Sequence, residues 1–154
     1  MERNVKLRKL IEEYLKKEKL MQLATANDNQ PWVCNVWFAA DRDLNIYWFS
    51  STSRRHSYEL MKNQKVAAAV VLRHAPKDPP RGLQLQGIAE MLTDQKDIDK
   101  AISAYRDRIF PMKTIKRLML DEENQHKFYR IKPTQFVLFD AVNFGDNWRQ
   151  AYSL

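Results

Sequence analysis

The chain has 154 residues, of which 44% are hydrophobic and 11% aromatic, so it is long enough for one folded domain with its own core. No apolar run approaches the roughly 18 residues of a membrane-spanning helix, and the first twenty residues lack the continuous apolar segment of a secretory signal. Cys34 is the single cysteine, which excludes a disulfide or a cysteine zinc site within one chain. We therefore expect a cytoplasmic protein.

The net charge of +7, from 26 basic and 19 acidic residues, is compatible with nucleic acid or with a small anionic ligand. Lysines often follow glutamates by four residues, as in Glu12–Lys16, which is typical of solvated helix faces. No zinc-finger or RNA-recognition pattern is present, so nucleic acid is the less favoured partner. The three histidines are scattered without metal-ligand spacing, and no metal site is expected.

The first half of the chain predicts one helix followed by a three-stranded meander. A single apolar stripe at helical spacing runs through the N-terminal segment, residues 1–19. Strands are expected at residues 20–26, 32–40 and 44–49, separated by turn signals at 27–31 and 41–43. Such short connections favour antiparallel pairing.

The second half predicts alternating strands and helices. We expect a helix at 57–62, a strand at 65–73, a loop at 74–80, a strand at 82–92, helices from the cap Thr93 or Asp94 to Pro111 and at 113–120, and a last strand pair at 127–131 and 135–141. Gly87 is expected to form a bulge, and Pro133 to interrupt the last pair. The order indicates a mainly β protein with helices (α+β), built as a small antiparallel barrel.

The junction from strand to helix at residues 48–61 is the most informative segment. Hydroxyl side chains, including Ser50 and Ser51, precede the basic triplet Arg54, Arg55 and His56 at the start of a helix. Cations at a helix N-terminus are unfavourable by about 0.3–1 kcal/mol each, whereas an anion there is stabilised by the free N–H groups. A bound phosphate would remove this conflict. A solvated basic turn with capping hydroxyls is the alternative. Only three glycines occur, which excludes the glycine-rich phosphate loops.

Several segments resemble one known family in order and spacing. "LMQLATANDNQPWVCNVWFAADRDLNIYWFSS" is similar to its opening meander, "SRRHSYELMKNQKVAAAVV" to its S-R-K…E-L…N-P…V-A pattern, and "GLQLQGIAEML" to its V-R-V-E-G strand. "AYRDRIFP" and "NFG" resemble elements of an uncharacterised bacterial subfamily. The chain thus resembles the pyridoxamine-5'-phosphate-oxidase-like FMN-binding split barrels. The resemblance implies an antiparallel six-stranded split β-barrel as one domain, 1–154, with a helical insertion at 94–120.

The resemblance also implies which residues hold the phosphate of FMN. Arg55 and His56 match the family's basic phosphate-clamping pair, and Ser50 matches its hydroxyl position. Ser51 is a further hydroxyl candidate, and Arg54 is an extra basic residue in the same loop. His56 stands where the family has a lysine, so its charge depends on pH unless the phosphate raises its pKa.

The flavin ring is expected at other positions. Asn35, Val36 and Trp37 lie on the strand whose backbone lines the isoalloxazine edge in the family, and Gln84 lies on the strand facing the flavin across the barrel. Trp148 could cover the dimethylbenzene edge, supplied by the same or the neighbouring subunit. The resemblance implies a homodimer. Apolar residues on both faces of the strands at 32–40 and 44–49 indicate that these surfaces lie in the interface.

Two departures from the family limit the expected activity. Cys34 stands where the oxidase has an arginine for the cofactor, and we expect it to be a small core residue. The arginine-and-histidine motif for the phosphorylated substrate is absent from "NFGDNWRQAYSL". We therefore expect an FMN-binding protein, as an FMN-dependent oxidoreductase with an unidentified small-molecule substrate and no assigned catalytic residue. The alternative is a non-catalytic module that binds haem, a nucleotide or nucleic acid.

Overall fold

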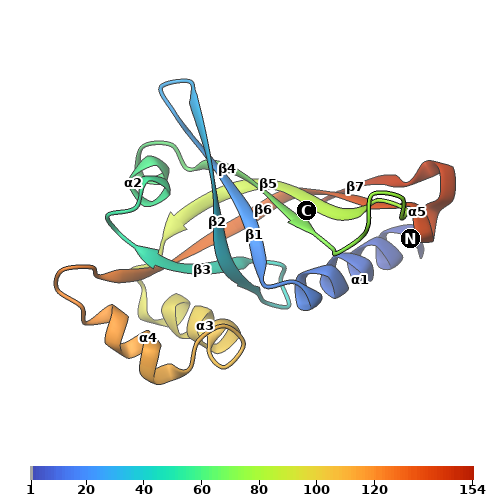
Figure 1. Cartoon of the computed structure of the whole chain (residues 1–154). Coiled ribbons are helices and arrows are strands. Elements are labelled where there is room, and N and C mark those ends of the chain that lie inside the picture. The colour runs from blue at the N-terminus through green and yellow to red at the C-terminus, as the bar shows by residue number, and fades with distance from the viewer. Residues whose placement is uncertain (1) are drawn as a thin grey trace.

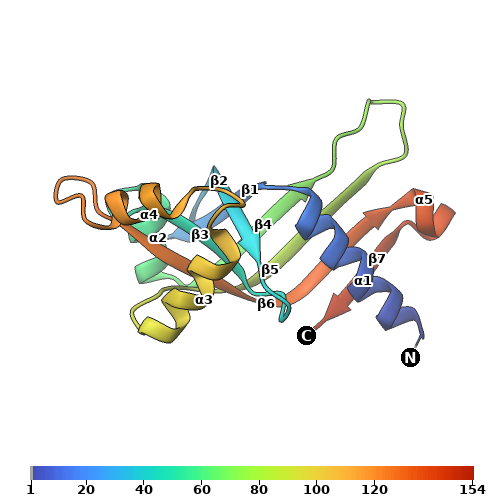
Figure 2. The same ribbon diagram turned by 90° about the horizontal axis from the view of Figure 1, so that it is seen from below.

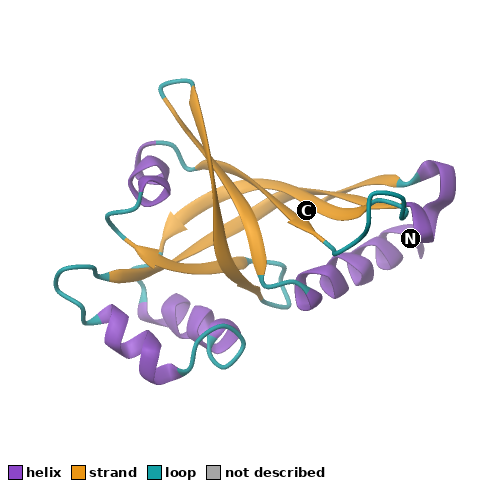
Figure 3. Cartoon of the chain, viewed as in Figure 1, coloured by secondary structure: helices purple, strands orange, loops and turns teal. Residues whose placement is uncertain are grey.

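The computed structural model describes residues 2–154 as one antiparallel sheet with helices around it (Figures 1 and 3). The helices are α1 (Glu2–Lys17), α2 (Arg55–Lys62), α3 (Gln95–Tyr105), α4 (Met112–Met119), α5 (Ala141–Phe144) and the short 3-10 turn η1 (Gly145–Asn147). The strands are β1 (Leu20–Asn27), β2 (Gln30–Ala40), β3 (Ile46–Ser51), β4 (Lys65–Val71), β5 (Arg81–Met91), β6 (His126–Asp140) and β7 (Arg149–Ser153). The α+β class predicted from the sequence is confirmed.

The sheet closes into an irregular ring of six strands. Its order is β3-β2-β1-β4-β5-β6-β7, and an additional pairing of β3 with β6 closes the first six strands and leaves β7 outside. The ring is split at one seam. β2 pairs with β1 from Gln30 to Trp37, but it pairs with β3 only through residues 38–40. The predicted six-stranded ring is present, and the seventh strand was not predicted.

The last part of the sheet corrects a sequence prediction. The expected strand pair at 127–131 and 135–141 is one continuous strand, β6, that crosses Pro133. The register of β5 and β6 shifts between Gln86 and Gly87, which pair with Gln135 and Pro133, so the extra residue of the bulge is Thr134 on β6, beside the proline, and not Gly87 as expected. A Cβ at Gly87 would lie 2.4 Å from the Lys132 carbonyl oxygen, which explains why this position requires glycine.

Two apolar clusters stabilise this arrangement. The larger fills the ring and includes the buried stripe of α1, namely Leu7, Ile11, Tyr14 and Leu15. The smaller lies between the outer side of β3 and the helices α3 and α4, which the figures place below the ring (Figures 1 and 2). It buries Tyr47 and Phe49 completely or nearly so. The expectation that the surface of β3 lies free for a partner subunit was therefore wrong, because α3 and α4 cover it.

Other sequence predictions agree with the local structure. Asp94 caps α3 by accepting hydrogen bonds from the backbone N–H groups of Lys96 and Asp97, as predicted. The turn between β1 and β2 places Asp28 and Asn29 at positive φ, a conformation that these residue types tolerate, and the hairpin projects from the body (Figure 1). Within residues 2–154, no helix combines the length and apolar character needed to cross a membrane.

Candidate functional site

The candidate site lies where β2 and β3 separate. Beyond the pair Phe38–Trp48 the two strands diverge, so within residues 2–154 the edge of β2 opposite β1 has no strand partner over residues 30–37. Helix α2 follows β3 directly and packs against β1 and β2 at this end of the ring (Figure 1). Unpaired backbone groups on a strand edge are available to a ligand.

His56 bridges the split between the two strands. Its Nδ1 lies 3.3 Å from Cys34 Sγ on β2, and its Nε2 lies 2.8 Å from Ser50 Oγ on β3. The side chain is buried, with 7% of the residue exposed. A neutral imidazole satisfies both contacts, because one ring nitrogen donates and the other accepts. The structure therefore places His56 inside the fold, where both ring nitrogens already have partners.

The electrostatics of this cluster favour neutral groups. Burial lowers the pKa of His56, Arg54 lowers it further, and Glu59 partly opposes the shift. Burial, with a smaller contribution from Glu59, raises the pKa of Cys34 to about 11. His56 is therefore uncharged near neutral pH in this structure, and Cys34 is a thiol. The positive charge at the start of α2 comes from Arg54 and Arg55.

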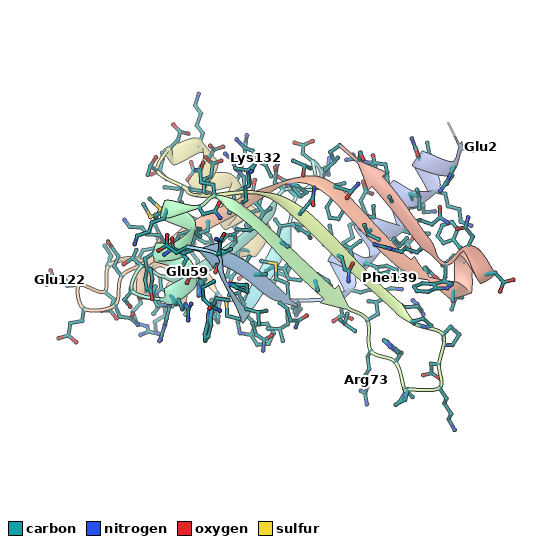
Figure 4. The ribbon with its side chains drawn as sticks, turned by 90° about the horizontal axis from the view of Figure 1, so that it is seen from above. Glu2, Glu59, Arg73, Glu122, Lys132 and Phe139 are labelled. Atoms are coloured by element: carbon teal, nitrogen blue, oxygen red, sulfur yellow. The ribbon has the colours of Figure 1, made fainter. Side chains whose placement is uncertain are left out.

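Arg55 is held by two neighbouring side chains, one of which is fixed in turn by a third. Its Nε donates to Glu59 Oε1 at 2.7 Å, and its guanidinium lies over the Trp32 ring at 4.2 Å from the centroid. Glu59 is buried, and Thr25 Oγ1 donates to its other oxygen at 2.5 Å. Although burial alone would raise the Glu59 pKa, hydrogen bonds from Thr25 and Arg55 leave it lowered, so the carboxylate stays charged. In Figure 4, Glu59 lies among closely packed side chains near α2.

The start of α2 is open to an anion. The N-cap residue is Arg54, which is exposed and makes no side-chain hydrogen bond to the helix. A serine, threonine or aspartate at this position would normally satisfy a free N–H group. Ser51 is buried, and its Oγ accepts from the Ser53 backbone N–H and lies 2.9 Å from Ser53 Oγ. The five predicted phosphate-site residues are thus together at one junction, but only Arg54 and Arg55 offer positive charge to solvent.

The outer face of the sheet forms a second part of the candidate site. Two rows of side chains cross six strands in register: Val33–Ala24–Ala67–Gln86–Gln135–Ser153 and Asn35–Gln22–Ala69–Gln84–Val137–Ala151. We call these twelve residues the uncharged face. All are exposed or half-exposed, and Gln22 Nε2 donates to Asn35 Oδ1 at 3.1 Å. A groove of about 440 Å³ lies over it, lined by Gln22, Val33, Gln84 and other residues of this face, and also by the charged Arg149.

The remaining predicted residues occupy different surroundings. Val36 is buried in the ring, so only its backbone can meet a ligand. Trp37 is 50% exposed, and its carbonyl oxygen accepts a 3.4 Å hydrogen bond from the Tyr105 hydroxyl. Trp148 packs on Phe139 at a ring distance of 5.5 Å. In Figure 4, Phe139 and Glu59 of α2 lie in different parts of the molecule, so Trp148 on Phe139 cannot join the α2 junction of its own chain.

Sequence reasoning missed the residues that hold Arg55. Thr25 and Trp32 lie on the β1–β2 hairpin, far from Arg55 in the chain, and no local pattern connects them to it. Glu59 could have been noticed as the residue four positions after Arg55, the spacing of a helical ion pair. His126 begins β6, is half-buried, and its ring lies 5.2 Å from that of Phe49.

Another groove lies away from this junction. It has a volume of about 700 Å³ and runs between α1, the β2–β3 turn and α3, with Lys16, Arg42, Lys100 and Arg108 among its lining residues. None of the ten predicted site residues lines it. The groove carries side chains of both charges, because Glu12, Asp41 and Asp43 line it as well.

Comparison with known proteins gives consistent matches. Residues 7–139 match the family model of pyridoxamine 5'-phosphate oxidase. A UPF0306 protein of Photorhabdus laumondii is 27% identical over 106 residues, which cover 67% of this chain and 71% of that protein.

Solved structures share the fold at lower identity. HutZ, a haem storage protein of Vibrio cholerae, is 20% identical with a TM-score of 0.67, covering 81% of this chain and 88% of that one. An FAD-binding protein of Mesorhizobium loti is 21% identical with a TM-score of 0.61, covering 80% and 85%. Proteins of this fold therefore include binders of flavin and of haem.

Proposed function

Since the chain belongs to the pyridoxamine 5'-phosphate oxidase family, we propose that it binds FMN, with the phosphate at the β3–α2 junction and the flavin ring along the free edge of β2. The observation that carries this proposal is the start of α2. Two arginines, serine hydroxyls and a helix N-terminus without a side-chain cap converge there, beside an edge of β2 that pairs with no other strand in the described part of the chain. Each of these groups favours a phosphate, and the two arginines do not stabilise the helix itself, because cations at its N-terminus are unfavourable.

The residues present fit an FMN phosphate. Arg55 uses only Nε for Glu59, so its two terminal nitrogens can donate to phosphate oxygens. Arg54 is exposed beside it and can approach the same anion. Ser50 is half-buried and held by His56, which gives its hydroxyl a defined position. We propose that His56 supports the site in its neutral form and that the charge of the phosphate is matched by the two arginines.

The flavin ring is matched by amides and backbone groups. Asn35 of β2 and Gln84 of β5 lie in one row of the uncharged face, and Gln22 of β1 lies between them, next to Asn35. Side-chain amides can both donate to and accept from the polar edge of an isoalloxazine. FMN would supply the redox chemistry, and the protein would orient it. We propose an FMN-dependent oxidoreductase, and no side chain at the site identifies its small-molecule substrate.

We further propose a homodimer that covers the uncharged face. Its twelve side chains carry no charge, in a chain of which 29% of residues are charged. Interface cores are depleted of charged residues in this way. Val33 and Trp37, which are 60% and 50% exposed, lie at its β2 end and would gain cover. Trp148 could then reach the flavin only from the partner subunit.

Haem binding is the second candidate. HutZ shares the fold and is a haem storage protein. In this chain, His56 and Cys34 are side chains of the kinds that ligate haem iron, and they lie together at the split. Their mutual contact and the contact of His56 with Ser50 would have to break before either could bind iron. The arginines at the start of α2 favour a phosphate over this arrangement.

Titration with three ligands tests the proposal. FMN, riboflavin and haemin are added separately to the purified chain, and binding is followed by calorimetry and absorbance. We expect FMN to bind tightly, riboflavin at least tenfold more weakly because it lacks the phosphate, and haemin without saturable binding. Equal affinity for FMN and riboflavin would refute the phosphate site. Saturable haemin binding in the absence of FMN binding would favour the second candidate.

A further inference from the structure

The Glu59–Arg55 pair is poorly explained as a stabiliser of the fold. Glu59 is 97% buried, as its 3% exposure shows, while the Arg55 side chain is 36% exposed. Burying a carboxylate costs free energy that a single partner seldom returns in full. In addition, an arginine in the first turn of α2 opposes the helix dipole, and the order Arg then Glu is the weaker orientation of a helical pair.

The geometry gives the pair a different use. Glu59 is fixed from below by Thr25, and it holds only the Nε side of the Arg55 guanidinium. Trp32 of the hairpin covers one face of the guanidinium at 4.2 Å. An arginine held at one edge and on one face has little rotational freedom left, and its two terminal nitrogens point in a defined direction. These nitrogens are the donors that suit a planar, two-point contact with phosphate.

We infer that Glu59 is a positioning residue: with Thr25 and Trp32 it holds Arg55 ready for the phosphate of the ligand. This inference rests on the proposed phosphate site and adds to it residues from β1, β2 and α2. The hairpin between β1 and β2 thereby becomes part of the ligand site through Trp32 and Thr25, although neither touches the ligand. The affinity for a phosphorylated ligand should depend on Glu59 only while Arg55 is present.

A double-mutant cycle tests this dependence. The dissociation constants of FMN, riboflavin and inorganic phosphate are measured for the wild type, Glu59→Gln, Arg55→Ala and the double variant. We expect Glu59→Gln to weaken FMN binding on the order of tenfold and to leave riboflavin unchanged, because Arg55 regains its rotamer freedom. In the Arg55→Ala background, the same substitution should not weaken FMN and should improve it, since it removes a carboxylate that would then repel the phosphate.

One control variant and one further test variant separate this effect from general damage to the fold. Arg8 and Glu12 on α1 form the same kind of pair, with Nε at 3.1 Å from Oε1 and a spacing of four residues, so Glu12→Gln should change no dissociation constant. Trp32→Leu alters the stacked face without touching the buried carboxylate, and it should weaken FMN about threefold. It serves as the second test if Glu59→Gln unfolds, which the midpoint of urea unfolding would reveal.

The outcomes distinguish the inference from the proposed function. Weakening of FMN by Glu59→Gln to the same extent with and without Arg55 would show that Glu59 acts through the fold and would refute the positioning role. A wild type that binds inorganic phosphate but not FMN, with the cycle intact for phosphate, would refute the flavin function and support the positioning role. A wild type that binds neither ligand would refute both.

Discussion

Removing the two arginines at the start of α2 should cost more affinity for FMN than any other pair of substitutions at the site. A charge-assisted hydrogen bond contributes about 1.5–3 kcal/mol. Arg54 is exposed and should lie at the lower limit, whereas Arg55 is held by Glu59 and Trp32 and should contribute more. The double variant Arg54→Ala/Arg55→Ala should therefore lose about 3–4 kcal/mol, which is two to three powers of ten in the dissociation constant.

The assay is a fluorescence titration of FMN at fixed ionic strength, because exposed charges are screened by salt. Riboflavin serves as the control ligand and should bind equally to both proteins. His56→Gln provides the comparison. It should cost less than either arginine, because the ring nitrogens of His56 contact Cys34 and Ser50 instead of facing solvent. If the double variant binds FMN within threefold of the wild type, the phosphate lies elsewhere and the reasoning fails.

Three further predictions concern the fold, the pH dependence and the assembly. Gly87→Ala should lower the free energy of unfolding in urea by more than about 2 kcal/mol, because its Cβ would lie 2.4 Å from the Lys132 carbonyl oxygen. Gly82→Ala, whose Cβ would lie 3.3 Å from its nearest atom, should lower it much less in the same assay. Because the pKa of His56 is lowered in the folded chain, the unfolded chain binds a proton first as the pH falls below about 6.5, and the free energy of unfolding should decrease there. His56→Gln should reduce this decrease, measured by thermal unfolding between pH 7.5 and 5.5. Light scattering at micromolar concentration should give a dimer, and Val33→Lys, which places a charge on the uncharged face, should give a monomer; a wild-type monomer would contradict the proposed interface.

The parts of the fold that the sequence predicted are those with local signals. The meander of β1, β2 and β3 follows from alternation and short turns, and Asp94 from its position before a helical stripe. The continuous β6 could not be read locally. A proline inside a strand normally ends it, and here a bulge at Thr134 of β6, with Gly87 of β5 opposite Pro133, accompanies the continuation of the strand.

The orientation of His56 could not be predicted either, and the reason lies in α2. The buried side of this helix carries His56, Ser57, Glu59 and Leu60, while Tyr58 and Met61 are exposed. Three of the four buried residues are polar, so hydrophobic periodicity predicts the wrong face of this helix to be buried. Thr25 and Cys34, on strands distant in sequence, satisfy Glu59 and one nitrogen of His56. Ser50 and the Ser51 carbonyl oxygen, six residues earlier on β3, satisfy the other His56 nitrogen and the Ser57 hydroxyl. Polar residues on a buried helix face are thus the signal that marks this site.

The central claim is that a phosphorylated flavin binds with its phosphate at the start of α2, and amide chemical-shift mapping tests it most directly. Proton–nitrogen spectra of the labelled chain are recorded with increasing FMN and, separately, riboflavin. We predict that the backbone amides of residues 54–57 shift with FMN and do not shift with riboflavin, while amides of β2 at residues 35–37 shift with both. FMN-induced shifts confined to the groove between α1 and α3, or an α2 start that does not respond to FMN, would contradict the claim.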